Sequence, residues 1–136
     1  MYQECQSLAV HWCTQLAKAS TSVYDLGGST GTLLLKLAQA VDKNKGIALF
    51  GVDNSQAMLE KSRETLRESP VPCEFIETDL NQGFPIQNAS VVVMNYTLQF
   101  VLPENRGPLL KNIYEGLLPD GSLVLIEKIK SGIPEL

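Results

Sequence analysis

The sequence predicts an α/β fold, a three-layer sandwich in which helices cover both faces of a parallel sheet of about five strands. Short apolar segments alternate five times with longer segments whose apolar residues recur at helical spacing, as in a wound parallel sheet. A glycine-rich turn at residues 27–31 joins the first strand to the next helix. We expect residues 1–136 to form a single domain, with an N-terminal helical segment at 1–21 and the core at 22–129.

Five segments have the length and composition of strands. The fourth is almost entirely apolar, which is typical of a parallel strand covered on both faces. The sequence Pro119-Asp120-Gly121 favours a turn before the fifth. The strands are expected at 22–26, 47–52, 74–78, 90–96 and 123–126.

Four further segments have helical periodicity. The first helix, within residues 3–19, is expected to bury Leu8, Ala9, Trp12, Leu16 and Ala19. The second covers 33–41. Ser55 can cap the third, which ends before Pro70 and is expected to bury Met58, Leu59 and Leu66. The fourth follows Pro103, and we expect Gly107 and Pro108 to break its first turn.

Composition and charge exclude several classes of function. The chain is 44% hydrophobic and 19% charged, with a net charge of −4, which is ordinary for a globular protein. Its densest basic group, at 61–67, is interleaved with glutamates, so direct contact with nucleic acid is disfavoured. No apolar run is long enough to span a bilayer and no signal peptide is apparent. We therefore expect a cytoplasmic protein with small-molecule partners and no membrane contact.

The cysteines and the single histidine do not form a metal-ligand pattern. Cys5, Cys13 and Cys73 have no paired spacing, and reduced core thiols are the expected interpretation. His11 has no partner visible in the sequence, so a surface or packed histidine is favoured over a general base. No metal site is predicted.

The glycine-rich turn indicates a nucleotide-type ligand. Gly27, Gly28 and Gly31 allow positive φ and close approach of the backbone to a ligand, although a turn needed only for packing is the alternative. The spacing is G-G-x-x-G rather than the G-x-G-x-x-G of dinucleotide-binding sheets, and Asp25 precedes the first glycine. A carboxylate there suits a cationic sulfonium and α-amino group better than a pyrophosphate. The electrostatics favour S-adenosylmethionine.

Two more carboxylates follow strands of the same sheet. Asp53 ends the second strand and can accept hydrogen bonds from ribose hydroxyls, or can simply cap a helix. Asp79 follows the third strand and can accept from the adenine amine, with Leu80 beside the ring, or can form a turn. Because the carboxyl ends of parallel strands meet at one edge, Asp25, Asp53 and Asp79 together indicate a binding site.

Asn95 interrupts the apolar fourth strand at its end, which marks a candidate site residue or an Asn that satisfies loop backbone groups. Tyr96 and Phe100 are interpreted as core or cofactor wall. Glu127 and Lys128 follow the fifth strand and are interpreted as solvated charges. No catalytic residue is assigned.

A set of short segments within residues 23–128 matches a known family: Val23-Tyr24-Asp25-Leu26-Gly27, Ser29, Gly31, Asp53-Asn54-Ser55, Ala57-Met58, Asn88-Ala89-Ser90, Asn95, Thr97-Leu98-Gln99-Phe100, Leu123-Val124-Leu125 and Glu127-Lys128. In these segments the chain resembles the carboxy-S-adenosylmethionine synthase family, once described as tRNA uridine-modifying methyltransferases. Ser29 stands where a general methyltransferase usually has glycine, and the family shares it.

The resemblance implies a Rossmann-like class I methyltransferase fold that binds S-adenosylmethionine or carboxy-S-adenosylmethionine. In the family, prephenate donates carbon dioxide to a sulfonium ylide, and the product serves tRNA wobble-uridine modification. Positioning and charge stabilisation replace a protein nucleophile. The implied cofactor shell is Gly27, Gly28, Ser29, Asp53, Asn54, Asp79, Leu80 and Asn95, with Tyr2 on the family's N-terminal ligand-contacting tyrosine.

Two features of the family have no counterpart in the sequence. Its C-terminal arginine, which meets the carboxylate, is absent, and so is the hairpin that usually follows the fifth strand. We therefore expect an exposed sheet edge that favours a homodimer. The alternatives to a synthase are an ordinary methyltransferase acting on a small molecule and a non-catalytic binding module.

Overall fold

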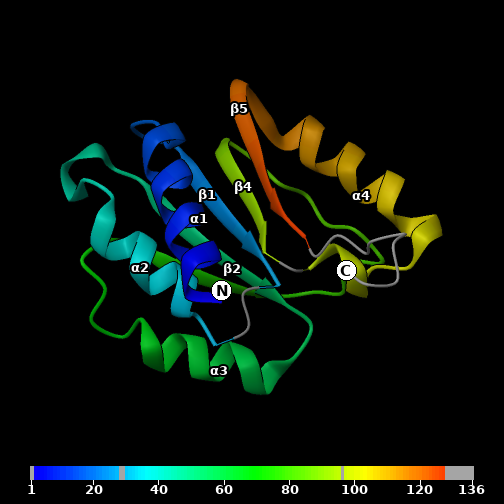
Figure 1. The fold of residues 1–136 in the computed structure, drawn as a ribbon, viewed down its shortest axis with the longest axis horizontal. Coiled ribbons are helices and arrows are strands. Elements are labelled where there is room, and N and C mark those ends of the chain that lie inside the picture. Colours follow the sequence, from blue (N-terminus) through cyan, green and yellow to red (C-terminus); the bar gives the residue numbers. More distant parts are fainter. Residues whose placement is uncertain (1, 28–29, 96, 128–136) are drawn as a thin grey trace, which may run out of the picture.

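The computed structural model describes residues 2–27, 30–95 and 97–127. Within them, five parallel strands form one sheet in the order β3-β2-β1-β4-β5 (Figure 1). The strands are β1 (Ser22–Leu26), β2 (Ala48–Asp53), β3 (Cys73–Glu77), β4 (Ala89–Asn95) and β5 (Leu117–Ile126). The predicted fold class is confirmed, and the first four strands lie within one residue of their predicted bounds.

Helices cover both faces of the sheet. Three of them, α1 (Tyr2–Leu16), α2 (Thr32–Ala40) and α3 (Gln56–Thr65), lie on one side, and α4 (Pro103–Gly116) lies on the other (Figure 1). Two short 3-10 turns, η1 (Lys43–Lys45) and η2 (Leu98–Phe100), complete the described elements. Ser55 caps α3 as predicted, because its side chain accepts a hydrogen bond from the amide of Met58.

The alternation of side chains along β4 explains why its residues 91–94 are all apolar. Val91 and Val93 pack in one core with α1 and α2, whereas Val92 and Met94 pack in a second core with Leu109 and Ile113 of α4. All four β4 residues are fully buried. Burial on both faces therefore explains the apolar run from Val91 to Met94, and the one polar residue before Asn95, Ser90, is buried with hydrogen-bond partners.

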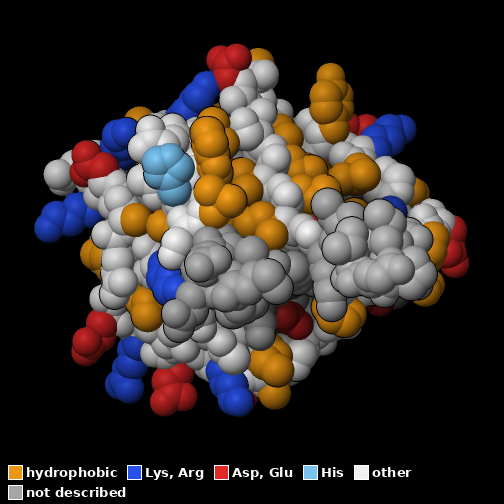
Figure 2. Space-filling model, viewed as in Figure 1, with side chains coloured by type: hydrophobic (Ala, Val, Ile, Leu, Met, Phe, Trp, Pro, Cys, Tyr) orange, Lys and Arg blue, Asp and Glu red, His pale blue; other side chains and the backbone are white. Residues whose placement is uncertain are grey.

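The buried face of the first helix matches the prediction only in part, since Ala9 is buried as predicted and Leu16 is partly buried, but Leu8, Trp12 and Ala19 are exposed. Gln6, Ala9, Cys13 and Ala17 are buried, whereas Leu8 and Trp12 remain 54% and 49% exposed. The residues at 9, 13 and 17 are small and four apart, so they let the helix approach the sheet closely. Orange apolar side chains reach the surface over α1 (Figure 2).

Two predicted breaks do not interrupt their elements. α4 continues through Gly107 and Pro108, because Leu109 and Ile113 anchor it on the sheet and this packing outweighs the backbone hydrogen bond that proline cannot donate. β5 begins at Leu117, so the predicted turn at Pro119-Asp120-Gly121 is wrong. There, Ala89 pairs with Leu117 and Val91 with Ser122, so the intervening residues bulge out of register.

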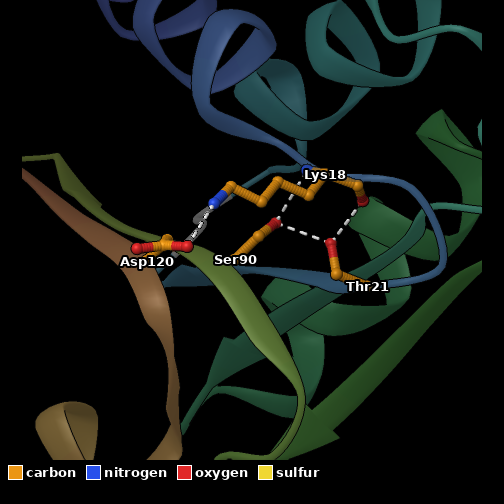
Figure 3. A network of polar contacts seen from close by, with 4 residues as sticks. All are labelled: Lys18, Thr21, Ser90 and Asp120. Carbon is orange, nitrogen blue, oxygen red and sulfur yellow. Dashed lines mark hydrogen bonds and ion pairs between the residues drawn. The ribbon is translucent and has the colours of Figure 1, made fainter.

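At the end of the sheet opposite the glycine turn, a network of hydroxyl hydrogen bonds joins the α1–β1 connection to β4 (Figure 3). Thr21 Oγ1 donates to the carbonyl of Lys18 at 2.6 Å, so Ser90 Oγ must donate to Thr21 Oγ1, also at 2.6 Å. Ser90 Oγ accepts from the Lys18 amide at 3.2 Å. The buried hydroxyl of Ser90 is thereby satisfied, and the α1–β1 connection is tied to β4. Lys18 also pairs with Asp120 of β5 at 3.4 Å, with both side chains largely exposed.

No helix among the described residues is long and apolar enough to cross a membrane.

Candidate functional site

A cavity of about 380 Å³ opens at the carboxyl ends of the strands, within the size range of small-molecule sites. Of the predicted site residues, Gly27, Asp53, Asn54, Asp79 and Leu80 line it. The other lining residues are Ser55, Met58, Thr78, Asn81, Thr97, Phe100 and Val101.

Gly27 brings the first strand to the cavity in a conformation that suits glycine. Its φ is +75°, and its amide donates to the carbonyl of Val52 at 2.7 Å. Thr97 lies directly over it and donates from Oγ1 to the carbonyl of Leu26 at 2.7 Å. The ends of β1, β2 and β4 are therefore joined beneath the cavity floor.

Gly31 also has a positive φ, +84°, and begins α2. It does not line the cavity and instead packs against the backbone of Ser62 in α3. Gly28 and Ser29 lie outside the described residues, as does the side chain of Tyr2. The structure therefore places only part of the predicted glycine turn.

Asp53 and Asp79 combine a turn-forming role with exposure to the cavity. Oδ1 of Asp53 accepts from the amide of Ser55 at 2.9 Å. Oδ1 of Asp79 accepts from the amide of Asn81 at 2.9 Å and from its side chain at 3.0 Å. The turn interpretation of Asp79 is thus confirmed, whereas Asp53 does not cap α3, whose N-cap is Ser55. These roles are compatible with ligand binding because both residues line the cavity.

Asp25 lies behind this site, fully buried on β1. Its Oδ2 atom has no hydrogen-bond partner in the described structure. Burial, and secondarily the negative charge of Asp53, raise the pKa of Asp25 to about 7. Burial and the charge of Asp25 in turn raise the pKa of the Cys13 thiol to about 12, so Cys13 is an unreactive core thiol, as predicted.

Within the described residues, Asn95 is the second residue with a buried acceptor that has no hydrogen-bond partner, its Oδ1 atom. Neither Asn95 nor Asp25 lines the cavity directly. Buried acceptors without donors are uncommon in proteins, so these two atoms indicate that a donor or a positive charge belongs nearby.

The cavity has a negative electrostatic character. It contains two carboxyl groups, and none of its described lining residues is Lys, Arg or His. Such a site favours a ligand with donors and positive charge over one with phosphates. A ligand with a sulfonium, an α-amino group and ribose hydroxyls fits the side chains present.

Several residues have roles that the sequence interpretation missed. Met58 was predicted in the buried face of α3 but lines the cavity, and Phe100 lines it as the predicted wall. Glu127 was interpreted as a solvated charge, yet its Oε1 accepts from the amide of Leu98 at 2.7 Å. The Thr97-Leu98-Gln99-Phe100 match was the sequence signal for this segment. His11 lies away from the cavity, with its ring against Trp12 on α1.

The chain belongs to the methyltransferase domain family, whose model matches residues 23–121. It is similar to the carboxy-S-adenosyl-L-methionine synthase of Methylococcus capsulatus, with 43% identity over 94% of this chain and 53% of that protein. The synthase of Alteromonas mediterranea is 46% identical over 89% of this chain and 51% of the relative. The chain therefore spans about half the length of these relatives.

Solved structures confirm the Rossmann-like class I fold. A SAM-bound amino pentose methyltransferase from Micromonospora echinaspora aligns with a TM-score of 0.74 at 17% identity, over 99% of this chain and 53% of that one. A putative S-adenosylmethionine-dependent methyltransferase from Methanococcus maripaludis aligns with a TM-score of 0.73 at 16% identity, over 91% and 56%. The predicted resemblance is confirmed by the synthase relatives.

Proposed function

We propose that this domain binds S-adenosylmethionine in the cavity at the strand ends and forms the cofactor-binding half of a carboxy-S-adenosylmethionine synthase. The proposal rests on the buried Oδ2 atom of Asp25, which has no partner among the described residues and lies behind a cavity lined by two further acidic residues. Three acidic residues around one cavity are costly without a cationic or donor-rich ligand. S-adenosylmethionine supplies both kinds of group.

Each carboxyl group has a proposed role. Asp53 would accept from the ribose hydroxyls and Asp79 from the adenine amine, with Leu80 and Met58 against the ring. Asp25 would stabilise the positive charge of the methionine end, and Asn95 would accept a hydrogen bond there. Gly28, Ser29, Asn54 and Tyr2 complete the proposed shell, and Gly27 and Gly31 shape the turn. When bound, the cofactor would supply the methyl carbon that its sulfonium activates. The protein would position the reactants and stabilise the charges that develop.

The similarity to carboxy-S-adenosylmethionine synthases supports prephenate as the second substrate. Prephenate carries carboxylate groups, which bind best to a positively charged side chain. None of the described residues that line the cavity is positively charged. We therefore propose that a cation outside them meets prephenate. On this proposal the product serves tRNA modification in the cytoplasm, and the net charge of −4 supports the absence of direct nucleic-acid contact.

Calorimetry and mass spectrometry test the proposal in two stages. We expect S-adenosylmethionine and its carboxylated form to bind and to raise the unfolding temperature, and NAD at micromolar concentration to do neither. Incubation with S-adenosylmethionine and prephenate should yield a cofactor heavier by one carbon dioxide, together with phenylpyruvate. Binding without this product would refute the synthase activity of the chain, and stabilisation by NAD alone would refute the cofactor assignment.

The negative cavity also favours a second candidate function. Because no lining cation is present among the described residues, a neutral or cationic methyl acceptor would fit the site better than prephenate. Release of S-adenosylhomocysteine with a small-molecule acceptor would identify an ordinary methyltransferase. Binding of the cofactor with neither product would indicate a non-catalytic module.

A further inference from the structure

One wall of the cavity is a connecting segment, which we call the wall segment, residues 97–102. It leaves β4, forms the short turn η2 and leads into α4. Thr97, Phe100 and Val101 line the cavity from this segment. A connection of this kind holds its shape only where other elements fix its backbone.

Three side-chain hydrogen bonds fix the two ends of the wall segment. At its start, Thr97 donates to the carbonyl of Leu26 in β1. At its end, the amide of Leu102 donates to Oδ1 of Asn81 at 2.8 Å, and Arg106 donates from Nε to the carbonyl of Val101 at 2.9 Å. The segment is thus held by β1, by the loop after β3 and by α4.

A fourth side-chain hydrogen bond, to Glu127, fixes the wall segment between its two ends. Glu127 directly follows β5, the strand at the sheet edge opposite β3. Its Oε1 atom accepts from the amide of Leu98 at 2.7 Å, in a half-buried position. Hydrogen bonds to an ionised acceptor are shorter and stronger than neutral ones. Glu127 itself does not line the cavity.

We propose that Glu127 is a positioning residue for the cofactor. By fixing the amide of Leu98, its carboxylate holds Thr97 on one side and Phe100 and Val101 on the other against the cavity. The edge strand β5 thereby contributes to cofactor affinity although no residue of β5 lines the cavity. This inference rests on the proposed binding of S-adenosylmethionine.

The test compares Glu127→Ala with Glu127→Gln, which keeps a neutral acceptor of the same shape. Loss of the acceptor leaves the Leu98 amide without its partner, and we expect Glu127→Ala to weaken S-adenosylmethionine binding about tenfold. Glu127→Gln should recover most of that loss. Glu115→Ala is the matched control, because Glu115 is an exposed glutamate that pairs with Lys111 at 3.9 Å and lies away from the cavity.

Amide hydrogen exchange separates positioning from a general loss of stability. Exchange at Leu98 should accelerate in Glu127→Ala, while exchange at Met94 in β4 should be unchanged. Equal cofactor affinity in Glu127→Ala and the wild type would overturn the inference and leave the proposed function intact. A uniform acceleration of exchange across the sheet, or no recovery in Glu127→Gln, would also overturn it. Failure of the wild type to bind S-adenosylmethionine would instead refute the proposed function itself.

Discussion

The Cγ2 atom of Thr97 lies 2.6 Å from the position that a Cβ atom would occupy on Gly27. Two segments far apart in the sequence thus meet where the glycine turn begins, and the contact leaves no space for a larger residue. The same Thr97 side chain donates to the carbonyl of Leu26. The restriction on residue 27 therefore comes both from its own φ of +75° and from its neighbour across the sheet.

Gly27→Ala is expected to destabilise the fold by about 1–3 kcal/mol, because it adds strain at positive φ to a clash with Thr97. Denaturant unfolding measures the change. Gly107→Ala is the control, since a Cβ atom there meets nothing within 4 Å and the position is helical, so it should stabilise by about 0.5–1 kcal/mol. Equal effects of the two substitutions would contradict the steric argument.

Asp25 is expected to make cofactor binding depend on pH. Because the pKa of Asp25 in the free protein is raised to about 7, its charge is largely absent near pH 6, and affinity for a cationic ligand should rise roughly tenfold towards pH 8. Calorimetry over this range measures the effect, and binding should release a proton near pH 6 to 7. Asp25→Asn should abolish the dependence. An identical pH profile in this variant would assign the dependence to another group.

The same shift predicts how stability without ligand varies with pH. The folded-state pKa lies above the ordinary value of 3.8, so the unfolded chain loses its proton first. The contribution of Asp25 to stability should therefore decline from about pH 4 to about pH 7 and stay constant above that. Unfolding of wild type and Asp25→Asn across this range isolates the contribution as a difference in slope.

Asp53 is expected to have separable roles in folding and binding. Asp53→Asn keeps an acceptor for the Ser55 amide, so it should fold normally but bind S-adenosylmethionine less tightly. Asp53→Ala should weaken binding at least about tenfold and also lower stability. Asp42→Ala is the matched control, because Asp42 accepts from the Asn44 amide at 2.9 Å outside the cavity. Asp42→Ala should lower stability without changing the affinity for S-adenosylmethionine. Unchanged affinity in Asp53→Ala would show that Asp53 does not belong to the binding site.

Ser90→Ala is expected to cost about 1–3 kcal/mol of stability, because it removes the donor to Thr21 Oγ1 and the acceptor of the Lys18 amide. Asp120→Ala, at the exposed end of the same network (Figure 3), should cost at most about 0.5 kcal/mol. Thermal unfolding compares the two. A larger effect of Asp120→Ala would show that the ion pair, rather than the buried hydroxyls, holds β4 to the α1–β1 connection.

The edge strand β5 is expected to favour self-association. Within the described chain it pairs only with β4, and Leu125 is 44% exposed, so unpaired backbone and apolar surface lie together. Sedimentation over a concentration series should reveal a dimer that Leu125→Lys weakens. A monomer at high concentration would contradict this expectation.

The local pattern of apolar and polar residues was enough to predict most strands and helices and the acidic residues at the strand ends. The apolar periodicity placed β1 to β4, and parallel winding brings the ends of those strands to one edge, which is why Asp53 and Asp79 could be assigned to one site before their positions were known. Propensity failed where packing opposed it. Pro108 remains in a helix that Leu109 and Ile113 hold on the sheet.

Tertiary structure alone decided the contacts that join distant segments. The sequence does not reveal that the side chain of Thr97 binds the backbone of Leu26. Nor does it reveal that the side chains of Asn81 and Glu127 bind the backbone amides of Leu102 and Leu98, respectively. It favoured burial of the large Leu8 and Trp12 together with Ala9, whereas of these only the small Ala9 is buried. Hydrophobicity along one chain reports which residues favour burial, but the space available depends on the surface opposite, which forms only when the chain folds.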